Sequence, residues 1–259
     1  MIRSLKIFIA SFPVKIIVWK LSCKLFGLKI PQKQHWFNFF TNKGGIEIGG
    51  PSSSFKSTGY LPIYPVIAKL DGVNFSESTV WEGIISQGDF YKYENKIGFQ
   101  YIAEGTNMPD IEENKYDFVL SCNNLEHIAN PINAVLEWKR IIKTGGNVLL
   151  ILPNKFANFD HKRPDSTIEH LIDDYNKKTT EEDTTHIEEI LNLHDLKRDS
   201  QAGSKVVFKK RCMNNFNNRC LHHHVYNQNL LKQLIEFCDM EVKLQYTSLS
   251  DHYIIGVKR

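Results

Sequence analysis

Short apolar runs alternate with stretches of helical spacing from Lys43 to the end of the chain. Such runs, bounded by glycine and polar residues, are typical of buried strands. The pattern predicts seven strands, over residues 45–48, 69–75, 98–103, 118–121, 148–152, 241–245 and 253–257. A helix is predicted over 131–142, closed by Lys143-Thr-Gly-Gly. Strands that alternate with helices and end in a pair of strands indicate an α/β domain of three layers with a mostly parallel sheet.

The strand pattern stops at Pro153 and returns only after about Asn229. The residues between, 154–229, are helical or irregular in pattern and rich in His, Asp, Glu and Arg. Because this segment follows directly on a predicted strand, it starts at the carboxyl edge of the sheet, where open α/β sheets bind ligands. We therefore expect one domain over 31–259, with an insertion at about 154–229 that covers the ligand end of the sheet.

Residues 1–30 form an extension with a helical pattern of their own. After Pro13, a favoured first residue of a helix, apolar residues recur on one face: Val14, Ile17, Val18, Leu21 and Leu25. Lysines interrupt every apolar run, so we expect neither a transmembrane helix nor a secretory signal. Two interpretations stay open, an interfacial helix attracted to anionic lipid and a helix that caps its own domain.

Charge is unevenly distributed along the chain. The 259 residues include 32 basic and 29 acidic residues, a net charge of +3. Six of the basic residues and no acid lie in 1–30, so the remainder has 26 basic against 29 acidic residues, a charge of −3. That balance argues against a nucleic-acid partner. The five cysteines include no Cys-x-x-Cys pair, so we expect a cytoplasmic protein, at the inner face of the membrane if the extension binds lipid.

A glycine-rich turn follows the first predicted strand, in the run Gly44-Gly-Ile-Glu-Ile-Gly-Gly-Pro-Ser52. Glycines let the backbone pass close to a ligand at the end of a strand, and Glu47 adds an acceptor inside the turn. The turn has neither the Gly-x-Gly-x-x-Gly pattern of dinucleotide sites nor the Gly-Lys-Ser/Thr of triphosphate sites. Binding of NAD and hydrolysis of nucleotides are therefore disfavoured.

A longer motif runs from Tyr116-Asp-Phe-Val-Leu-Ser-Cys-Asn-Asn-Leu-Glu-His-Ile-Ala-Asn-Pro131 through the helix and Gly145-Gly146 into the strand at 148–152. It resembles the class I S-adenosylmethionine-dependent methyltransferases, in a branch like methyltransferase type 11. The resemblance implies a Rossmann-like fold with a mostly parallel seven-stranded sheet. It also implies methyl transfer with S-adenosylmethionine as the cofactor.

The same resemblance assigns cofactor contacts. It implies that Glu47, Gly49 and Gly50 hold the methionine part of the cofactor. Asn74 stands where the family usually has an acid that accepts from both ribose hydroxyls. An amide there can accept from one hydroxyl and donate to the other.

Further along the chain, Glu104 would accept from the adenine amino group, and the Gly105 backbone would bond the ring. Asn123 follows the fourth predicted strand and would face the transferable methyl group. The Glu126-His127 pair that begins the next helix resembles the turn of ubiquinone-pathway O-methyltransferases, where such a pair helps to bind a divalent cation. The acid expected at Asn123 is missing, so a cation would need another oxygen, for which Asp160 is the candidate.

The insertion carries a second resemblance, through segments such as Phe159-Asp-His-Lys-Arg-Pro164 and Cys220-Leu-His-His-His-Val225. These resemble methyltransferases of bacterial surface-glycan synthesis and imply O-methylation of a sugar or another hydroxylated small molecule. Seven of the ten histidines lie between His161 and His224, and histidines near a cofactor cleft are candidates for taking a proton from a hydroxyl.

Roles in the acceptor site are assigned accordingly. We expect His161 to be the base, with His127 as the second candidate and Asp160 as an orienting partner. Arg163 is expected to contact an anionic part of the acceptor, and His222 and His224 are expected to line its pocket. Two alternatives stay open: an inactive cofactor-binding module, and a methyltransferase acting on protein or nucleic acid.

Overall fold

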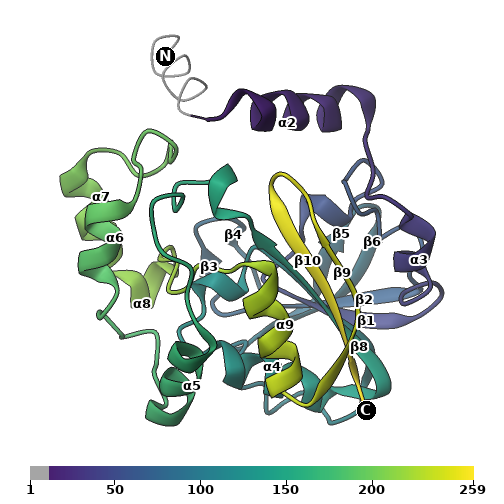
Figure 1. Ribbon diagram of the computed structural model, residues 1–259. Helices are drawn as coiled ribbons and strands as arrows, with labels where there is room; N and C mark the ends of the chain where they lie inside the picture. The colour runs from purple at the N-terminus through teal and green to yellow at the C-terminus, as the bar shows by residue number, and fades with distance from the viewer. Residues whose placement is uncertain (1–11) are drawn as a thin grey trace.

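The computed structural model describes residues 12–259, and its centre is a twisted sheet of eight strands (Figure 1). The strands are β1 (Gly44–Ile48), β2 (Lys69–Asn74), β5 (Gly88–Tyr93), β6 (Lys96–Ile102), β7 (Tyr116–Cys122), β8 (Ile142–Pro153), β9 (Met240–Thr247) and β10 (Asp251–Lys258). Their order is β5-β6-β2-β1-β7-β8-β10-β9. The five strands from β6 to β8 in this order pair in parallel, and β10 pairs antiparallel to both β8 and β9. All seven predicted strands and the Rossmann-like fold class are confirmed.

The structure differs from the sequence-based prediction at two places, the sheet edge and the end of helix α4. The eighth strand, β5, pairs antiparallel with β6 at the sheet edge, and a small hairpin of β3 (Ser78–Thr79) and β4 (Gly83–Ile84) precedes it. Helix α4 (Pro131–Ile141) ends where the chain turns extended at Ile142, so residues 143–146 continue β8 and do not cap the helix. Apolar runs alone did not reveal β5 because its buried positions are tyrosines and its apolar Phe90 is exposed.

One face of the sheet is covered by helices α4, α9 (Gln228–Phe237) and α5 (Ile168–Lys177), which pack around the buried Trp138. The other face is covered mainly by residues 51–68, which contain only the short 3-10 helix Ser53–Phe55, and by α3 (Lys33–Phe37). Three prolines and Gly59 interrupt 51–68, which explains why no long helix forms there. Buried aromatic side chains fill this layer instead, among them Phe55 and Tyr64.

The insertion is helical, as expected, and lies beside the sheet in Figure 1. Besides α5 it contains α6 (Ile187–Leu193), α7 (Lys205–Met213) and α8 (Asn215–Asn218). It has a small apolar core of its own, centred on Ile190, Phe208 and Leu221. From Arg219 the chain runs extended through the three consecutive histidines to α9.

Helix α2 (Val14–Phe26) lies at the margin of the fold (Figure 1). Ile16 is buried, and the Trp19 ring meets the Tyr60 ring edge-on with centroids 5.4 Å apart. The opposite side, where the sequence predicts an apolar face, is open: Val14 is 74% and Leu25 71% exposed. That face does not cap the domain. Residues 1–11 of the predicted extension lie outside the described part of the chain, and within 12–259 no helix has the length and apolarity to cross a bilayer.

Candidate active site

The turn after β1 is held from within by a buried carboxylate. Glu47 is fully buried and accepts hydrogen bonds from the Tyr64 hydroxyl (2.6 Å), the Tyr91 hydroxyl (2.7 Å) and the Ser52 backbone N–H (3.0 Å). Burial raises the pKa of this carboxyl, and the three donors oppose that rise. Glu47 therefore shapes the glycine turn, and its oxygens face the chain's own donors and not an open cavity.

The two glycines of this turn let its backbone lie closer to neighbouring side chains than any residue with a Cβ could. Gly49 has φ +78°, and a Cβ there would lie 2.5 Å from the Asn124 side-chain oxygen. A Cβ on Gly50 would collide with Glu47 and Tyr91. The turn is thus packed on one side against β5 and on the other against the residues that follow β7.

A cleft follows the carboxyl ends of the central strands. We call its two parts the inner and the outer cavity; both are lined by Gly49, Trp81, Asn124 and His127. The inner cavity, of about 40 Å³, extends past Asn74, Phe75, Glu104, Gly105 and Arg219. The outer cavity, of about 280 Å³, extends past Ser52, Ser53, Ser54, Glu82 and Asn123. Of the predicted cofactor residues, Gly49, Asn74, Glu104, Gly105 and Asn123 therefore line this one cleft.

Two polar atoms in the cleft have no partner within residues 12–259. The Asn74 amide donates to the Gly50 carbonyl (3.1 Å), but its oxygen is buried and unpaired. The Asn124 amide nitrogen is likewise buried and unpaired. An unsatisfied buried group costs roughly 1–3 kcal/mol, which a ligand with a matching group would recover. A ribose hydroxyl suits the Asn74 oxygen, so the residues present fit S-adenosylmethionine.

Arg219 narrows the inner cavity. Its guanidinium donates to both Glu104 oxygens, at 2.7 and 3.1 Å, and lies 4.7 Å from the centroid of the Phe75 ring. A flat cation stacked on an aromatic ring and paired with Glu104 occupies the position expected for adenine, whose amino group would use the same carboxylate. With about 40 Å³ free, the inner cavity has room for a few waters, so cofactor binding requires this side chain to move.

An Arg219→Ala variant should therefore bind S-adenosylhomocysteine more tightly than wild type, by up to about 5-fold, because a partly exposed ion pair is worth at most about 1 kcal/mol. Calorimetric titration measures this. Arg211→Ala, which breaks the pair with Asp199 away from the cleft, is the control and should leave the affinity unchanged. Weaker binding by Arg219→Ala would show that the guanidinium contacts the cofactor and does not exclude it.

His127 presents a free nitrogen at the junction of the two cavities. Its Nδ1 lies 3.2 Å from the Leu221 carbonyl oxygen, which can only accept, so Nδ1 carries the hydrogen and Nε2 keeps its lone pair. Burial, together with the nearby charge of His222, lowers the pKa of His127 well below its usual value. The imidazole is therefore neutral near pH 7.

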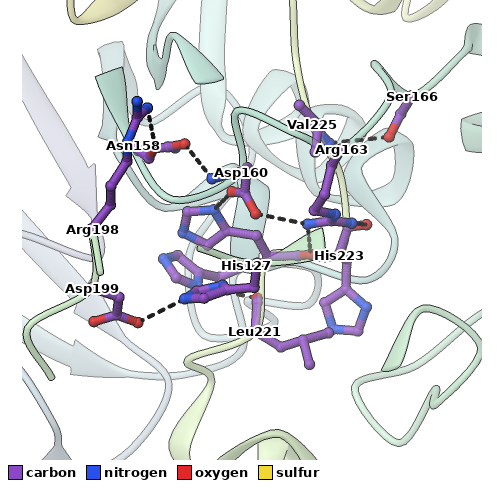
Figure 2. A network of polar contacts seen from close by, with 12 residues as sticks. His127, Asn158, Asp160, Arg163, Ser166, Arg198, Asp199, Leu221, His223 and Val225 are labelled. Atoms are coloured by element: carbon purple, nitrogen blue, oxygen red, sulfur yellow. Dashed lines mark hydrogen bonds and ion pairs between the residues drawn. The ribbon is translucent and has the colours of Figure 1, made fainter. Parts of the chain in front are cut away.

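The His127 ring contacts His222, which in turn contacts two buried charged side chains, Asp160 and Arg163. The His222 and His127 rings meet edge-on, 4.5 Å apart, and His222 Nδ1 lies 2.5 Å from Asp160. Figure 2 shows the Arg163 guanidinium directed at Asp160, with a nitrogen-to-oxygen distance of 3.2 Å. Burial alone would raise the pKa of Asp160, but His222 and Arg163 lower it to about 2. Burial raises the pKa of the neighbouring Glu126 to about 7.

Several predicted acceptor-site residues lie elsewhere. His161, the first candidate for the base, bonds Asp195 through Nε2 (2.9 Å) and is not among the residues that line the cleft. Arg163 is buried, and besides Asp160 it donates to Glu189 and to backbone carbonyls of the histidine run. Its donors are thus committed within the chain, which argues against its expected contact with an acceptor.

The histidine run is also turned inward. His222 and His224 are buried, and each bonds a carboxylate of the insertion, Asp160 and Asp174 respectively. For the expected cation site, ligand atoms of Glu126, His127 and His222 lie within 4.8 Å of one another. Asp160 is not in that set, because it is bonded to His222.

Sequence reasoning missed the residues that narrow the cleft, namely Trp81, Asn124 and Arg219. Asn124 is adjacent to the predicted Asn123 and could have been found from that position. Trp81 and Arg219 come from the β3–β4 hairpin and the end of α8, and no local pattern placed either of them at the sheet edge.

Residues 69–150 match a protein family described as a methyltransferase domain. No curated protein matches the sequence. Among solved structures, a SAM-dependent methyltransferase from Aquifex aeolicus is similar, with 13% identity, a TM-score of 0.47 and coverage of 95% of this chain and 97% of that one. A SAM-dependent methyltransferase from Thermotoga maritima, described as a possible histamine N-methyltransferase, is also similar, with 15% identity, a TM-score of 0.44 and the same coverages.

The family match begins at β2 and ends within β8, so it spans the strands whose carboxyl ends form most of the cleft. The matched strands lie in the expected parallel order, with β1 and its glycine turn in the middle of the sheet. The unpaired oxygen of Asn74, which suits a ribose hydroxyl, lies at the end of β2, where the sequence predicts it. Residues 69–150 thus match a methyltransferase domain, and the cleft residues fit S-adenosylmethionine as its cofactor.

Proposed function

We propose that the protein methylates a hydroxyl oxygen of a sugar or a similar hydroxylated small molecule, with His127 as the general base. The observation that supports this is the free Nε2 of a neutral imidazole at the junction of the inner and outer cavities. A base at that point can reach a hydroxyl presented to the cleft from the outer side.

The proposed reaction needs little chemistry from the protein itself. When bound, S-adenosylmethionine supplies a methyl group already activated on a sulfonium. The residues of the cleft would hold the acceptor oxygen in line with that methyl group, and His127 Nε2 would take the hydroxyl proton as the methyl group passes from sulfur to oxygen. The products would be a methyl ether, S-adenosylhomocysteine and an imidazolium, whose charge the nearby Asp160 carboxylate would offset. Alignment of the acceptor supplies most of the rate enhancement.

The lining of the outer cavity supports a hydroxylated acceptor. Three consecutive serines, Ser52 to Ser54, lie on one side, with Glu82 and Asn123 on the other. Hydroxyl, carboxylate and amide groups can bond several sugar hydroxyls at once, and Trp81 offers an aromatic surface for a sugar ring. Surface-glycan synthesis in the cytoplasm is the setting that we propose for such an acceptor, in line with the second sequence resemblance.

A catalytically inactive cofactor-binding module is the second candidate. The replacement of usual acids by Asn74 and Asn123, and the presence of Arg219 in the inner cavity, favour it. Such a module would bind S-adenosylhomocysteine without forming it from S-adenosylmethionine in the presence of any acceptor.

The proposed function is tested with S-adenosylmethionine labelled in the methyl group and a panel of free sugars, nucleotide sugars and lipid-linked sugars. We expect label in one acceptor class, and it should survive mild alkali because a methyl ether does not hydrolyse. Label released as methanol would show a carboxylate acceptor, and label retained on nitrogen by NMR would show an amine. Either result would overturn methylation of a hydroxyl while leaving methyl transfer itself intact.

We further propose that α2 contacts an anionic membrane surface. Its outward face carries Val14, Val18, Leu21 and Leu25, each more than half exposed, with Lys15 and Lys24 beside them. An exposed apolar helix face flanked by cations suits the interface of a bilayer rich in anionic lipid.

The full chain should therefore sediment with vesicles containing phosphatidylglycerol, and salt should weaken the binding. A Val18→Ser/Leu25→Ser variant should lose most of it, because both side chains point away from the domain. Ile84→Ser, at an apolar position 89% exposed in β4, is the matched control and should sediment like wild type. Equal sedimentation of both variants would exclude α2 as the contact.

A further inference from the structure

Four potential metal ligands converge in the insertion, away from the cleft. His170 and Asp174 lie one turn apart on α5, so they share one face of that helix. His186 directly precedes α6, and His224 lies in the extended run before α9. One ligand atom of each lies within 4.8 Å of the others.

The distances match a small tetrahedral ion. Two ligands each about 2.0–2.1 Å from a tetrahedral centre lie about 3.3 Å apart. The Nε2 atoms of His170 and His186 are 3.1 Å apart, and Asp174 Oδ2 lies 3.3 Å from His170 Nε2 and 2.9 Å from His224 Nε2. Three of the six distances among these three imidazole nitrogens and one carboxylate oxygen therefore match the spacing that a metal would impose, and the other three are at most 4.8 Å.

The chemistry of the four donors also suits a metal. Three imidazole nitrogens and one carboxylate oxygen are ligand types that zinc binds in proteins. The donor set of nitrogen and one oxygen selects zinc over magnesium or calcium, which prefer oxygen ligands.

We propose that His170, Asp174, His186 and His224 bind a structural Zn²⁺ ion. A complete set of four protein ligands leaves no open position for chemistry, as is typical of structural zinc sites. The ion would tie α5, the start of α6 and the histidine run together. It would thereby fix the intervening turn, in which residues 178–181 line a cavity of about 640 Å³ that reaches Glu104 and Arg219.

The site is tested on the untagged full chain, by elemental analysis after gel filtration and by replacement with Co²⁺. We expect about one zinc per chain, and the Co²⁺ form should show the intense visible absorption of a tetrahedral centre. His186→Gln and Asp174→Asn should each weaken zinc binding by at least about 100-fold, because loss of a mere outer-shell partner already costs 10–100-fold. Glu169→Gln and Asp173→Asn, also on α5, are the matched controls and should bind zinc like wild type.

Two results would overturn the proposal. A folded wild-type chain without zinc, and without tetrahedral absorption when Co²⁺ is added, would show that hydrogen bonds alone hold the cluster. Zinc retained in both ligand variants but lost in His127→Gln would place the ion at Glu126, His127 and His222 instead. The Co²⁺ spectrum of the wild type decides the matter even if a ligand variant fails to fold. None of these readouts depends on methyl transfer.

Discussion

A Gly49→Val variant should bind S-adenosylmethionine at least about 100-fold more weakly than wild type, equivalent to about 2.7 kcal/mol. The φ of +78° disfavours a β-branched residue, and the added Cβ would collide with the Asn124 side chain, which lines both cavities. Both effects displace the turn that borders the cofactor. Calorimetric titration measures the affinity, and far-ultraviolet circular dichroism confirms that the sheet is retained.

Gly145→Val is the matched control for this substitution. Gly145 has nearly the same φ, +76°, but a Cβ there meets nothing within 4 Å. It lies near the start of β8, at the opposite end of that strand from the cleft. We expect Gly145→Val to lose stability because a positive φ disfavours valine, and to keep the cofactor affinity of wild type. Equal affinities of the two variants would contradict the placement of the cofactor at the Gly49 turn.

A His127→Ala variant should lower the turnover number by about 10²-fold or more, the usual contribution of a general base. Affinity for S-adenosylhomocysteine should change little, because the turn at Gly49 and the oxygen of Asn74 remain. Turnover is measured by formation of S-adenosylhomocysteine at saturating acceptor.

His161→Ala provides the comparison, since His161 is held by Asp195 outside the cleft and should lower turnover less than about 5-fold. Wild-type turnover should also stay level from pH 8 to 6.5, because burial and His222 hold the pKa of His127 below its usual value, so the base stays neutral over that range. Greater loss in His161→Ala than in His127→Ala would restore the sequence-based assignment of the base.

Strands β7 and β8 could be predicted from the sequence because residues 118–120 and 148–152 are continuous apolar runs buried on both faces. Strand β5 could not, since its buried positions are tyrosines such as Tyr91, whose hydroxyl is needed by Glu47. The layer formed by residues 51–68 also could not be predicted from the sequence. Its prolines exclude a helix, but nothing local shows that its aromatic side chains cover a sheet face.

The cleft at the ends of the strands was predictable because parallel strands end together, so residues after successive strands meet. The arrangement of the insertion beside it was not predictable, because it depends on how the insertion folds back. His161 lies close in sequence to the end of β8, yet it pairs with Asp195. His127 is positioned by Leu221 and His222, which are more than 90 residues away along the chain.

Calorimetric titration of the full chain with S-adenosylmethionine and with S-adenosylhomocysteine tests cofactor binding most directly. We expect one binding site per chain for each compound, shared between them, so that prior saturation with one abolishes the heat of the other. Both affinities should fall at least about 100-fold in Gly49→Val and stay unchanged in Gly145→Val. A folded wild-type chain that binds neither compound at millimolar concentration would contradict the assignment of this cleft to S-adenosylmethionine.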